Sequence, residues 1–280
     1  MMKNILKKIA DAIKTYRIHK SMPLHIEFNL TDHCNLNCKG CSHYSPLAPD
    51  EQLPLADLEN AMRRIADARN AATIKEVYLI GGETLLYRNL EEAMALARRF
   101  FPRIPVKIFT NGLLIPKMPD SFWEACRKYD CTLAITRYPV KFDYEKVADI
   151  CRRQGVATMI FGDRSMADSF FRFPLDPAKS KNARLAHFRC TSFGCVTVDN
   201  GRIFPCSQSA CIRHVNNRFG TDFRWENGDF IEVDKLRDVK EIIRLRNRPV
   251  PFCAYCGHTT TTTYGPSQRV AREWIDSPRS

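Results

Sequence analysis

Short apolar segments alternate along the chain with stretches of helical period. The strand-like segments keep every second residue apolar or run apolar throughout, and we expect strands at 24–30, 75–80, 106–110, 131–136 and 156–161. Between them apolar residues recur every three or four positions, which predicts helices at 54–66, 90–101, 121–129 and 143–154. Strands that alternate with helices imply a parallel sheet. The pattern therefore predicts an α/β fold, in which about six βα units form a partial (β/α)6 TIM-like barrel that is splayed open on one side.

The pattern changes at both ends of this region. Residues 1–22 should contain an N-terminal amphipathic helix, because apolar positions such as Ile5, Ile9 and Ile13 share a face beside many basic residues. We favour its packing against the barrel over its lying on an anionic membrane surface. Residues 163–188 lack a clear period, and we expect a helix with loops over the open side. From residue 190 Gly, Pro and Cys become frequent, until a helix at about 235–247. We therefore expect a barrel over 23–188 and a small cysteine-rich extension over 189–280.

Composition narrows the class of protein. The 280 residues are 44% hydrophobic and 26% charged, as in an ordinary soluble domain. No apolar stretch approaches the roughly 20 residues of a membrane span, and no cleavable signal is visible, so we expect a cytoplasmic protein. The net charge of +12 suits nucleic acid, an anionic substrate, a membrane surface or simply a basic solvated surface. We expect no specific nucleic-acid partner, because no known binding module is present.

The 12 cysteines are too many for an ordinary cytosolic enzyme and suggest metal or redox chemistry. Cys34, Cys38 and Cys41 have the spacing C-x3-C-x2-C and directly follow the first predicted strand. Such a triplet can hold three irons of an iron–sulfur cube and leave the fourth iron open. A disulfide and a zinc site are the alternatives. A disulfide is disfavoured because the chain shows no secretory signal. A zinc site is disfavoured because such sites usually show two C-x2-C pairs.

A second motif, Gly81-Gly82-Glu83-Thr84, follows the second predicted strand. Together, the triplet and this motif resemble the signature of the radical S-adenosylmethionine (SAM) enzymes, in which a GGEP motif ends the second strand. The resemblance extends from about residue 22 to about residue 162. Two positions depart from the family's pattern. Gly40 stands where an aromatic residue usually precedes the third cysteine, and Thr84 stands in place of Pro.

The resemblance implies a [4Fe-4S] cluster on Cys34, Cys38 and Cys41 that binds SAM and cleaves it to a 5′-deoxyadenosyl radical. It also implies which residues surround SAM. In the family, the GGE backbone and glutamate hold the SAM amino group. Polar residues after the third and fourth strands lie beside SAM. The SAM-binding residues expected on this basis are Gly81, Gly82, Glu83, Thr110, Asn111, Thr136 and Arg137.

A second cysteine set follows residue 190. Cys190, Cys206, Cys253 and Cys256 resemble the ligand pattern of the Twitch extension, the shortened SPASM domain that follows many radical SAM barrels. The resemblance implies that they hold an auxiliary [4Fe-4S] cluster. A zinc ribbon is the alternative. The dipeptide Asn200-Gly201 between two short apolar runs predicts a hairpin that returns Cys206 beside Cys190.

The remaining cysteines divide into two groups. Cys126, Cys131 and Cys151 fall in helix or strand patterns and should be buried apolar residues. Cys195 and Cys211 each lie five residues from a proposed ligand. We expect either to be a substitute ligand or a hydrogen-atom donor in the active site.

The resemblance implies an oxidoreductase or epimerase that removes a hydrogen atom from an unactivated carbon. We favour oxidation or epimerisation of a sugar, a cyclitol or another small polar metabolite, since the single-cluster layout is similar to that of the radical SAM dehydrogenase of 2-deoxy-scyllo-inosamine. A peptide maturase is the second hypothesis. It is less favoured, because only about 22 residues precede the barrel. A non-catalytic iron–sulfur protein is the third. A flavodoxin or ferredoxin is the expected reducing partner.

Overall fold

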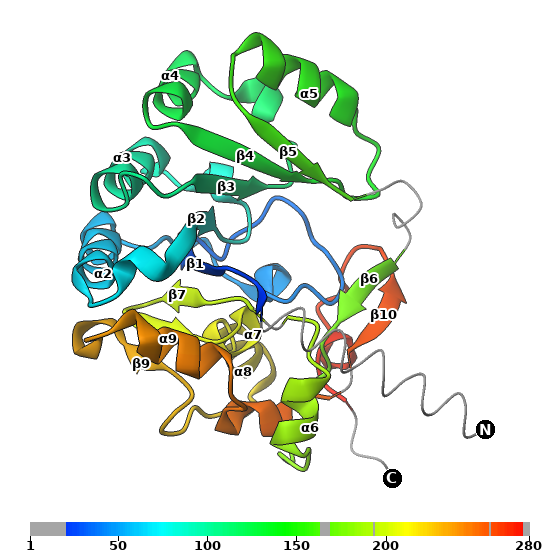
Figure 1. Ribbon diagram of the computed structural model, residues 1–280. Helices are drawn as coiled ribbons and strands as arrows, with labels where there is room; N and C mark the ends of the chain where they lie inside the picture. Colours follow the sequence, from blue (N-terminus) through cyan, green and yellow to red (C-terminus); the bar gives the residue numbers. More distant parts are fainter. Residues whose placement is uncertain (1–20, 163–168, 193, 258, 277–280) are drawn as a thin grey trace, which may run out of the picture.

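The computed structural model describes residues 21–162, 169–192, 194–257 and 259–276, which form one mixed α/β unit (Figure 1). The amphipathic helix expected over residues 1–20 lies outside the described residues. The described strands are β1 Leu24–Asn29, β2 Ile74–Ile80, β3 Val106–Thr110, β4 Cys131–Thr136, β5 Thr158–Phe161, β6 Ser169–Arg172, β7 Thr197–Asp199, β8 Arg202–Phe204, β9 Ile231–Glu232 and β10 Thr260–Thr263. The described α-helices are α2 Leu55–Asp67, α3 Leu90–Phe100, α4 Asp120–Lys128, α5 Tyr144–Arg153, α6 Ala183–Phe188, α7 Ser207–Ala210, α8 Arg213–Phe219 and α9 Val239–Arg246.

The main sheet confirms the predicted partial barrel. Its eight strands lie in the order β5-β4-β3-β2-β1-β7-β8-β9, and β1 to β5 are parallel. Figure 1 shows α2, α3, α4 and α5 along the outer side of this fan of strands. Residues that share a face across the register, such as Phe28 with Leu79 and Ile108 with Leu133, are fully buried under these helices. Apolar burial against the helices therefore fixes which face of each strand turns outward.

The sixth parallel strand comes from an unexpected place. It is β7, which pairs with β1 through Glu27 and Thr197 instead of following β5. β7 continues into the predicted hairpin with β8, where Asn200 and Gly201 have φ of 45° and 72°. These left-handed values explain the Asn-Gly turn. The first strands of the cysteine-rich region therefore belong to the same sheet as the barrel.

The prediction of a helix with loops over 163–188 was wrong in one element. β6 is a strand, which pairs antiparallel with β10 in a separate two-stranded sheet. Figure 1 shows this pair apart from the main sheet, on the side away from α2 and α3. The five threonines at 259–263 are β-branched and favour a strand, but the partner of that strand is 91 residues distant in sequence and could not be inferred.

The helix expected at about 235–247 is shorter than predicted. A 3₁₀ turn occupies Val233–Lys235, and α9 begins only after Asp238. Asp238 and Glu241 form a reciprocal capping box, which fixes this start. Among the described helices, none combines the length and the apolar character needed to cross a bilayer.

Candidate cluster and SAM site

The cysteine triplet lies in the loop that follows β1, at the carboxyl end of the parallel strands. Cys38 is 6% exposed, while Cys34 and Cys41 are half-buried. All 12 cysteines lie in the described part of the chain, and each is a free thiol, so the disulfide alternative has no support. Burial raises the pKa of Cys34 and of Cys38 to about 12. Such thiols ionise only beside added positive charge, which fits a site for iron.

The C-terminal segment holds this loop in place. The backbone N–H of Lys39 donates to the carbonyl of Gly265 at 2.9 Å, and the N–H of Ser267 donates to the carbonyl of Asn37 at 2.7 Å. The Trp274 indole N–H donates to the Cys41 carbonyl at 3.1 Å. The loop that carries the triplet is therefore fixed by residues more than 220 positions later in the chain.

The GGE motif packs directly on the start of the cysteine loop. The N–H of Gly82 donates to the carbonyl of Thr31 at 2.7 Å, and the N–H of Glu83 donates to that of His33 at 2.9 Å. A Cβ on Gly81 would overlap the Thr31 carbonyl, and one on Gly82 would overlap the His33 carbonyl. The motif requires two glycines because the backbones meet here without room for a side chain.

Glu83 is 1% exposed, and its carboxylate accepts three hydrogen bonds from the protein. The donors are the Thr110 hydroxyl at 2.6 Å and the backbone N–H groups of Asn111 at 2.8 Å and Leu85 at 3.0 Å. Burial raises the pKa of this carboxyl. The carboxylate thus joins the ends of β2 and β3, and its contact with SAM stays a prediction.

The other predicted SAM residues lie at the same edge of the sheet. The Asn111 amide donates to Asn35 at 2.6 Å and lies 3.9 Å from the Cys34 sulfur, so this residue connects the end of β3 to the triplet. Thr136 ends β4, and the Arg137 guanidinium that follows it pairs with Glu145 at 2.7 Å. These side chains therefore lie at the carboxyl ends of β3 and β4, and Asn111 is the one with a contact to a triplet cysteine among the bonds described. Their roles toward SAM remain predictions.

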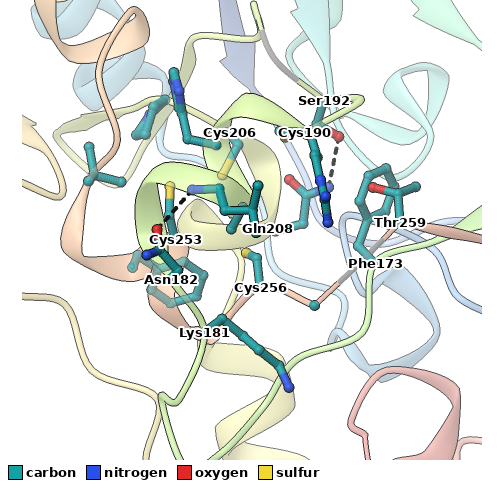
Figure 2. A pocket seen from close by; sticks show the side chains of 18 of the residues that line it. Phe173, Lys181, Asn182, Cys190, Ser192, Cys206, Gln208, Cys253, Cys256 and Thr259 are labelled. Atoms are coloured by element: carbon teal, nitrogen blue, oxygen red, sulfur yellow. Dashed lines mark hydrogen bonds between the residues drawn. The ribbon is translucent and has the colours of Figure 1, made fainter. Parts of the chain in front are cut away.

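The second cysteine set gathers around one pocket of about 170 Å³. Figure 2 shows Cys190, Cys206, Cys253 and Cys256 around it, although they come from segments far apart in sequence. Burial raises the pKa of Cys190 and Cys253 to about 12. Four convergent thiols fit either a cubane cluster or zinc. The pocket is also lined by basic side chains that suit an anionic tetrathiolate centre: Lys181, Arg189, Arg246 and Arg248.

Sequence reasoning missed a polar group on the inner face of the barrel. His25 and Glu27 project from β1 to the same side, and their side chains lie 3.3 Å apart. Cys195, just before β7, completes a group whose nitrogen, oxygen and sulfur atoms all lie within 4.8 Å of one another. Burial alone would raise the pKa of Glu27, but the bonds from His25 and from the Thr197 hydroxyl lower it. The sequence did contain a signal for this group, because polar residues occupy every second position of β1 and must therefore share one face of the sheet.

Cys211 lies elsewhere, in a buried network between the two cysteine sets. Its thiol is 3.6 Å from Asp32, which also accepts hydrogen bonds from Asn29 at 2.7 Å and from His214 at 2.7 Å. Arg213 pairs with both Asp32 and Asp199. Burial would raise the pKa of Asp32, but the bond from His214 and the charge of Arg213 hold it well below its usual range.

The expected buried apolar cysteines are confirmed. Cys126, Cys131 and Cys151 are at most 3% exposed and lie within the main core. They are remote from both cysteine sets in the fold, on α4, β4 and α5. These three cysteines therefore pack as apolar core residues and are not candidate metal ligands.

Comparison with known proteins agrees with this geometry. Residues 28–160, a little under half of the chain, match the family model of the Radical SAM superfamily. The superfamily implies a [4Fe-4S] cluster and SAM.

Individual relatives match over limited regions. A "GTP 3′,8-cyclase" of Mycobacterium marinum is 40% identical over 103 residues, which cover 36% of this chain and 28% of that protein. One of Helicobacter pylori is 29% identical over 101 residues, which cover 36% and 31%. The chain thus matches less than a third of either relative. A crystal structure of BtrN in complex with AdoMet and 2-DOIA is 12% identical, with a TM-score of 0.54 over 85% of this chain and 94% of that one. This last likeness concerns the fold alone.

Proposed function

We propose that this protein is a radical SAM enzyme that oxidises or epimerises a small polar metabolite such as a sugar or cyclitol. Cys34, Cys38 and Cys41 would hold the SAM cluster, and Cys190, Cys206, Cys253 and Cys256 an auxiliary [4Fe-4S] cluster in a Twitch-like region, residues 189–280. When bound, the first cluster supplies the electron that cleaves SAM to a 5′-deoxyadenosyl radical. The second supplies a one-electron acceptor, which suits net oxidation.

The convergence of the four cysteines on one pocket carries this proposal. They come from the loop after α6, the end of the β7–β8 hairpin and the 3₁₀ turn Pro251–Tyr255 with the residue after it. No structural need for apolar packing explains four half-buried thiols at one point. Proximity to the inner face supports the same proposal, because Cys190 and Cys206 are close enough to Cys195 to contribute to the raised pKa of its thiol, after burial and Glu27.

The inner face supports a polar substrate. Glu27 is buried and favours the ionised state, and His43 near it has a buried Nε2 without a partner among the described residues. Rings from successive strands line the same face, with Tyr78 stacked on His25 at 4.5 Å and 4.7 Å from Phe109. Carboxylate and imidazole groups beside aromatic rings suit the hydroxyls and C–H faces of a polyol ring.

The geometry separates the two candidate hydrogen-atom donors. Cys195 is beside Glu27 on the inner face, and burial raises the pKa of its thiol well above the usual value, which keeps the S–H intact. Cys211 is fully buried and bonded within the network around Asp32. Cys195 is therefore the better candidate for donating a hydrogen atom to a substrate radical.

Two other substrates need a direct comparison. The relatives named GTP 3′,8-cyclase suggest GTP, and a ribosomal peptide is the alternative for a maturase. Anaerobic assays with a reductant, such as a flavodoxin or ferredoxin, would compare 5′-deoxyadenosine formation with sugars and cyclitols, with GTP and with a leader peptide. Stimulation by GTP or by the peptide alone would redirect the assignment. Absence of 5′-deoxyadenosine under all reducing conditions would favour a non-catalytic iron–sulfur protein.

Iron and sulfide content tests the two-cluster proposal. Two four-iron clusters require about eight irons per chain, and a Cys34/Cys38/Cys41→Ala variant should keep about four. A Cys190/Cys206/Cys253/Cys256→Ala variant should also keep about four. The wild type could instead hold only about four irons and lose all of them in the Cys34/Cys38/Cys41→Ala variant. The second cysteine set would then be a zinc site or a group of free thiols. The electron-acceptor role would then fall.

A further inference from the structure

Gly40 stands where the family usually carries an aromatic residue before the third cysteine, and its backbone conformation disfavours one. Its φ of +74° is left-handed, which strains any other residue. β6 also lies against it, because a Cβ there would be 3.7 Å from both the Phe171 carbonyl and the Arg172 Cβ. The aromatic ring beside this cysteine loop comes instead from another part of the chain.

That ring belongs to Tyr264 of the C-terminal segment. Its hydroxyl lies 3.6 Å from the Cys38 sulfur, and its ring centroid is 6.0 Å from those of Tyr138 and Phe170. The position of Tyr264 is fixed by main-chain bonds, because the residues after it pair with Asn37 and Lys39 around Cys38. No rearrangement of the segment is needed to bring the hydroxyl to the sulfur.

The direction of this hydrogen bond follows from the chemistry of the ligand. A cysteine that holds iron is a thiolate without a proton, so the Tyr264 O–H must donate. Hydrogen bonds to ligand sulfurs help to set the reduction potential of an iron–sulfur cluster, since they stabilise the more negative reduced state. Cys34 receives a comparable bond from the Leu36 N–H at 3.3 Å, but that donor is backbone and cannot be removed by substitution.

We propose that Tyr264 tunes the SAM cluster, its O–H donating to the Cys38 thiolate and raising the reduction potential. This rests on the proposed cluster at the triplet. One electron enters from an external reductant such as dithionite, no covalent bond changes, and the proton stays on the Tyr264 oxygen. Tyr264 is thus a positioning residue that acts on the cluster through Cys38, and it makes the C-terminal segment part of the SAM site.

The test is an EPR-monitored redox titration of the full reconstituted chain with dithionite. Tyr264→Phe keeps the ring and removes the donor. The cluster whose EPR signal changes when SAM is added should become about tenfold harder to reduce in this variant. Its reduction potential should shift by about 59 mV to a more negative value for one electron. Tyr138→Phe is the matched control, because it removes a hydroxyl from the same aromatic group without a described bond to a cysteine. It should leave the potential unchanged.

Each other outcome has a definite meaning. An unchanged potential in Tyr264→Phe, or an equal shift in Tyr138→Phe, overturns the proposal. Loss of the cluster from Tyr264→Phe also overturns it, because the hydroxyl is assigned no part in holding iron. In wild type, an exchangeable deuteron coupled to this cluster should be visible in D₂O and vanish in Tyr264→Phe, and its persistence would exclude the bond. A wild type without any signal that responds to SAM would instead contradict the proposed function.

Discussion

Single carboxylates in this protein are held by several donors at once, and Asp176 is the clearest case outside the cysteine loops. It is 8% exposed and follows the buried Leu175. It accepts hydrogen bonds from the Ser180 hydroxyl at 2.5 Å and from the N–H groups of Ser180 at 3.1 Å and Ala178 at 3.0 Å. Burial would raise the pKa of Asp176, but these bonds lower it.

Asp176→Asn should lower the free energy of unfolding by about 1–2 kcal/mol. The NH₂ group of the asparagine would replace an acceptor oxygen and would face a donor of Ser180, so a hydrogen bond would be lost. A depressed folded pKa contributes stability above the unfolded value, near 4, and that contribution is lost as pH falls through the folded value. The difference between wild type and variant should therefore be constant from pH 7 to pH 5 and shrink below about pH 4. Urea unfolding of the metal-free chains measures it.

Asp130→Asn is the control, since the Asp130 side chain is 96% exposed. It should change stability by less than about 0.5 kcal/mol at any pH. If the difference in unfolding free energy between wild type and Asp176→Asn grew as the pH fell, the pKa of Asp176 would not be lowered in the folded state, and the prediction would be wrong.

At the scale of elements, the end of β2 and the cysteine loop are one unit. Gly81 and Gly82 approach the backbone of residues 31–33 so closely that neither can carry a side chain. The two loops exchange backbone hydrogen bonds there, and Glu83 extends the contact to β3. The geometry of the triplet therefore depends on a contact that contains no cysteine.

Gly82→Ala should displace the cysteine loop, because the added methyl overlaps the His33 carbonyl. We expect the reconstituted variant to lose roughly one four-iron cluster, about half of the iron of a two-cluster wild type. Gly265→Ala is the control near the same loop, where a Cβ meets no atom within 4 Å. Equal iron contents in the two variants would show that the close approach does not position the triplet.

At the scale of the whole molecule, a buried charge network joins the barrel to the second cysteine region. Asp32 lies two residues before Cys34, Asp199 ends β7, and Arg213 begins α8 a few residues after Cys206. Arg213 pairs with both carboxylates, and the Asn29 amide bridges them at 2.7 and 2.9 Å. The two proposed cluster sites are therefore held to each other by side chains that belong to neither.

Arg213→Leu would leave two buried carboxylates without their cation and should cost about 3 kcal/mol of unfolding free energy. Arg152→Leu, which breaks an exposed pair with Asp149, should cost at most about 1 kcal/mol. Adding Asp199→Asn to Arg213→Leu should recover part of the loss, because one uncompensated charge is removed. Denaturant unfolding at pH 7 compares the three variants with wild type. An Arg213 variant no less stable than the Arg152 variant would mean that the network contributes little.

Local patterns predicted the elements whose signals are contained in one stretch of sequence. Alternation gave β1 to β4 within one residue, while β5 begins at Thr158, two residues later than expected. The helical periods gave α2 to α5, and Asn200-Gly201 gave the hairpin. The C-x3-C-x2-C spacing gave the first cysteine group, since spacing along one loop limits which thiols can meet. The second group, whose members lie far apart in sequence, came from its resemblance to a known ligand pattern.

What only the tertiary structure decided are the contacts between segments distant in sequence. The pairing of β7 with β1, the strand pair β6–β10 and the approach of Tyr264 to Cys38 each join residues 88 to 226 positions apart. The group His25, Glu27 and Cys195 has the same origin. The sequence determined the class of chemistry, because a ligand triplet and a glycine turn are local. The surroundings of each sulfur were decided by packing, because closing a long loop leaves no periodic trace in the sequence.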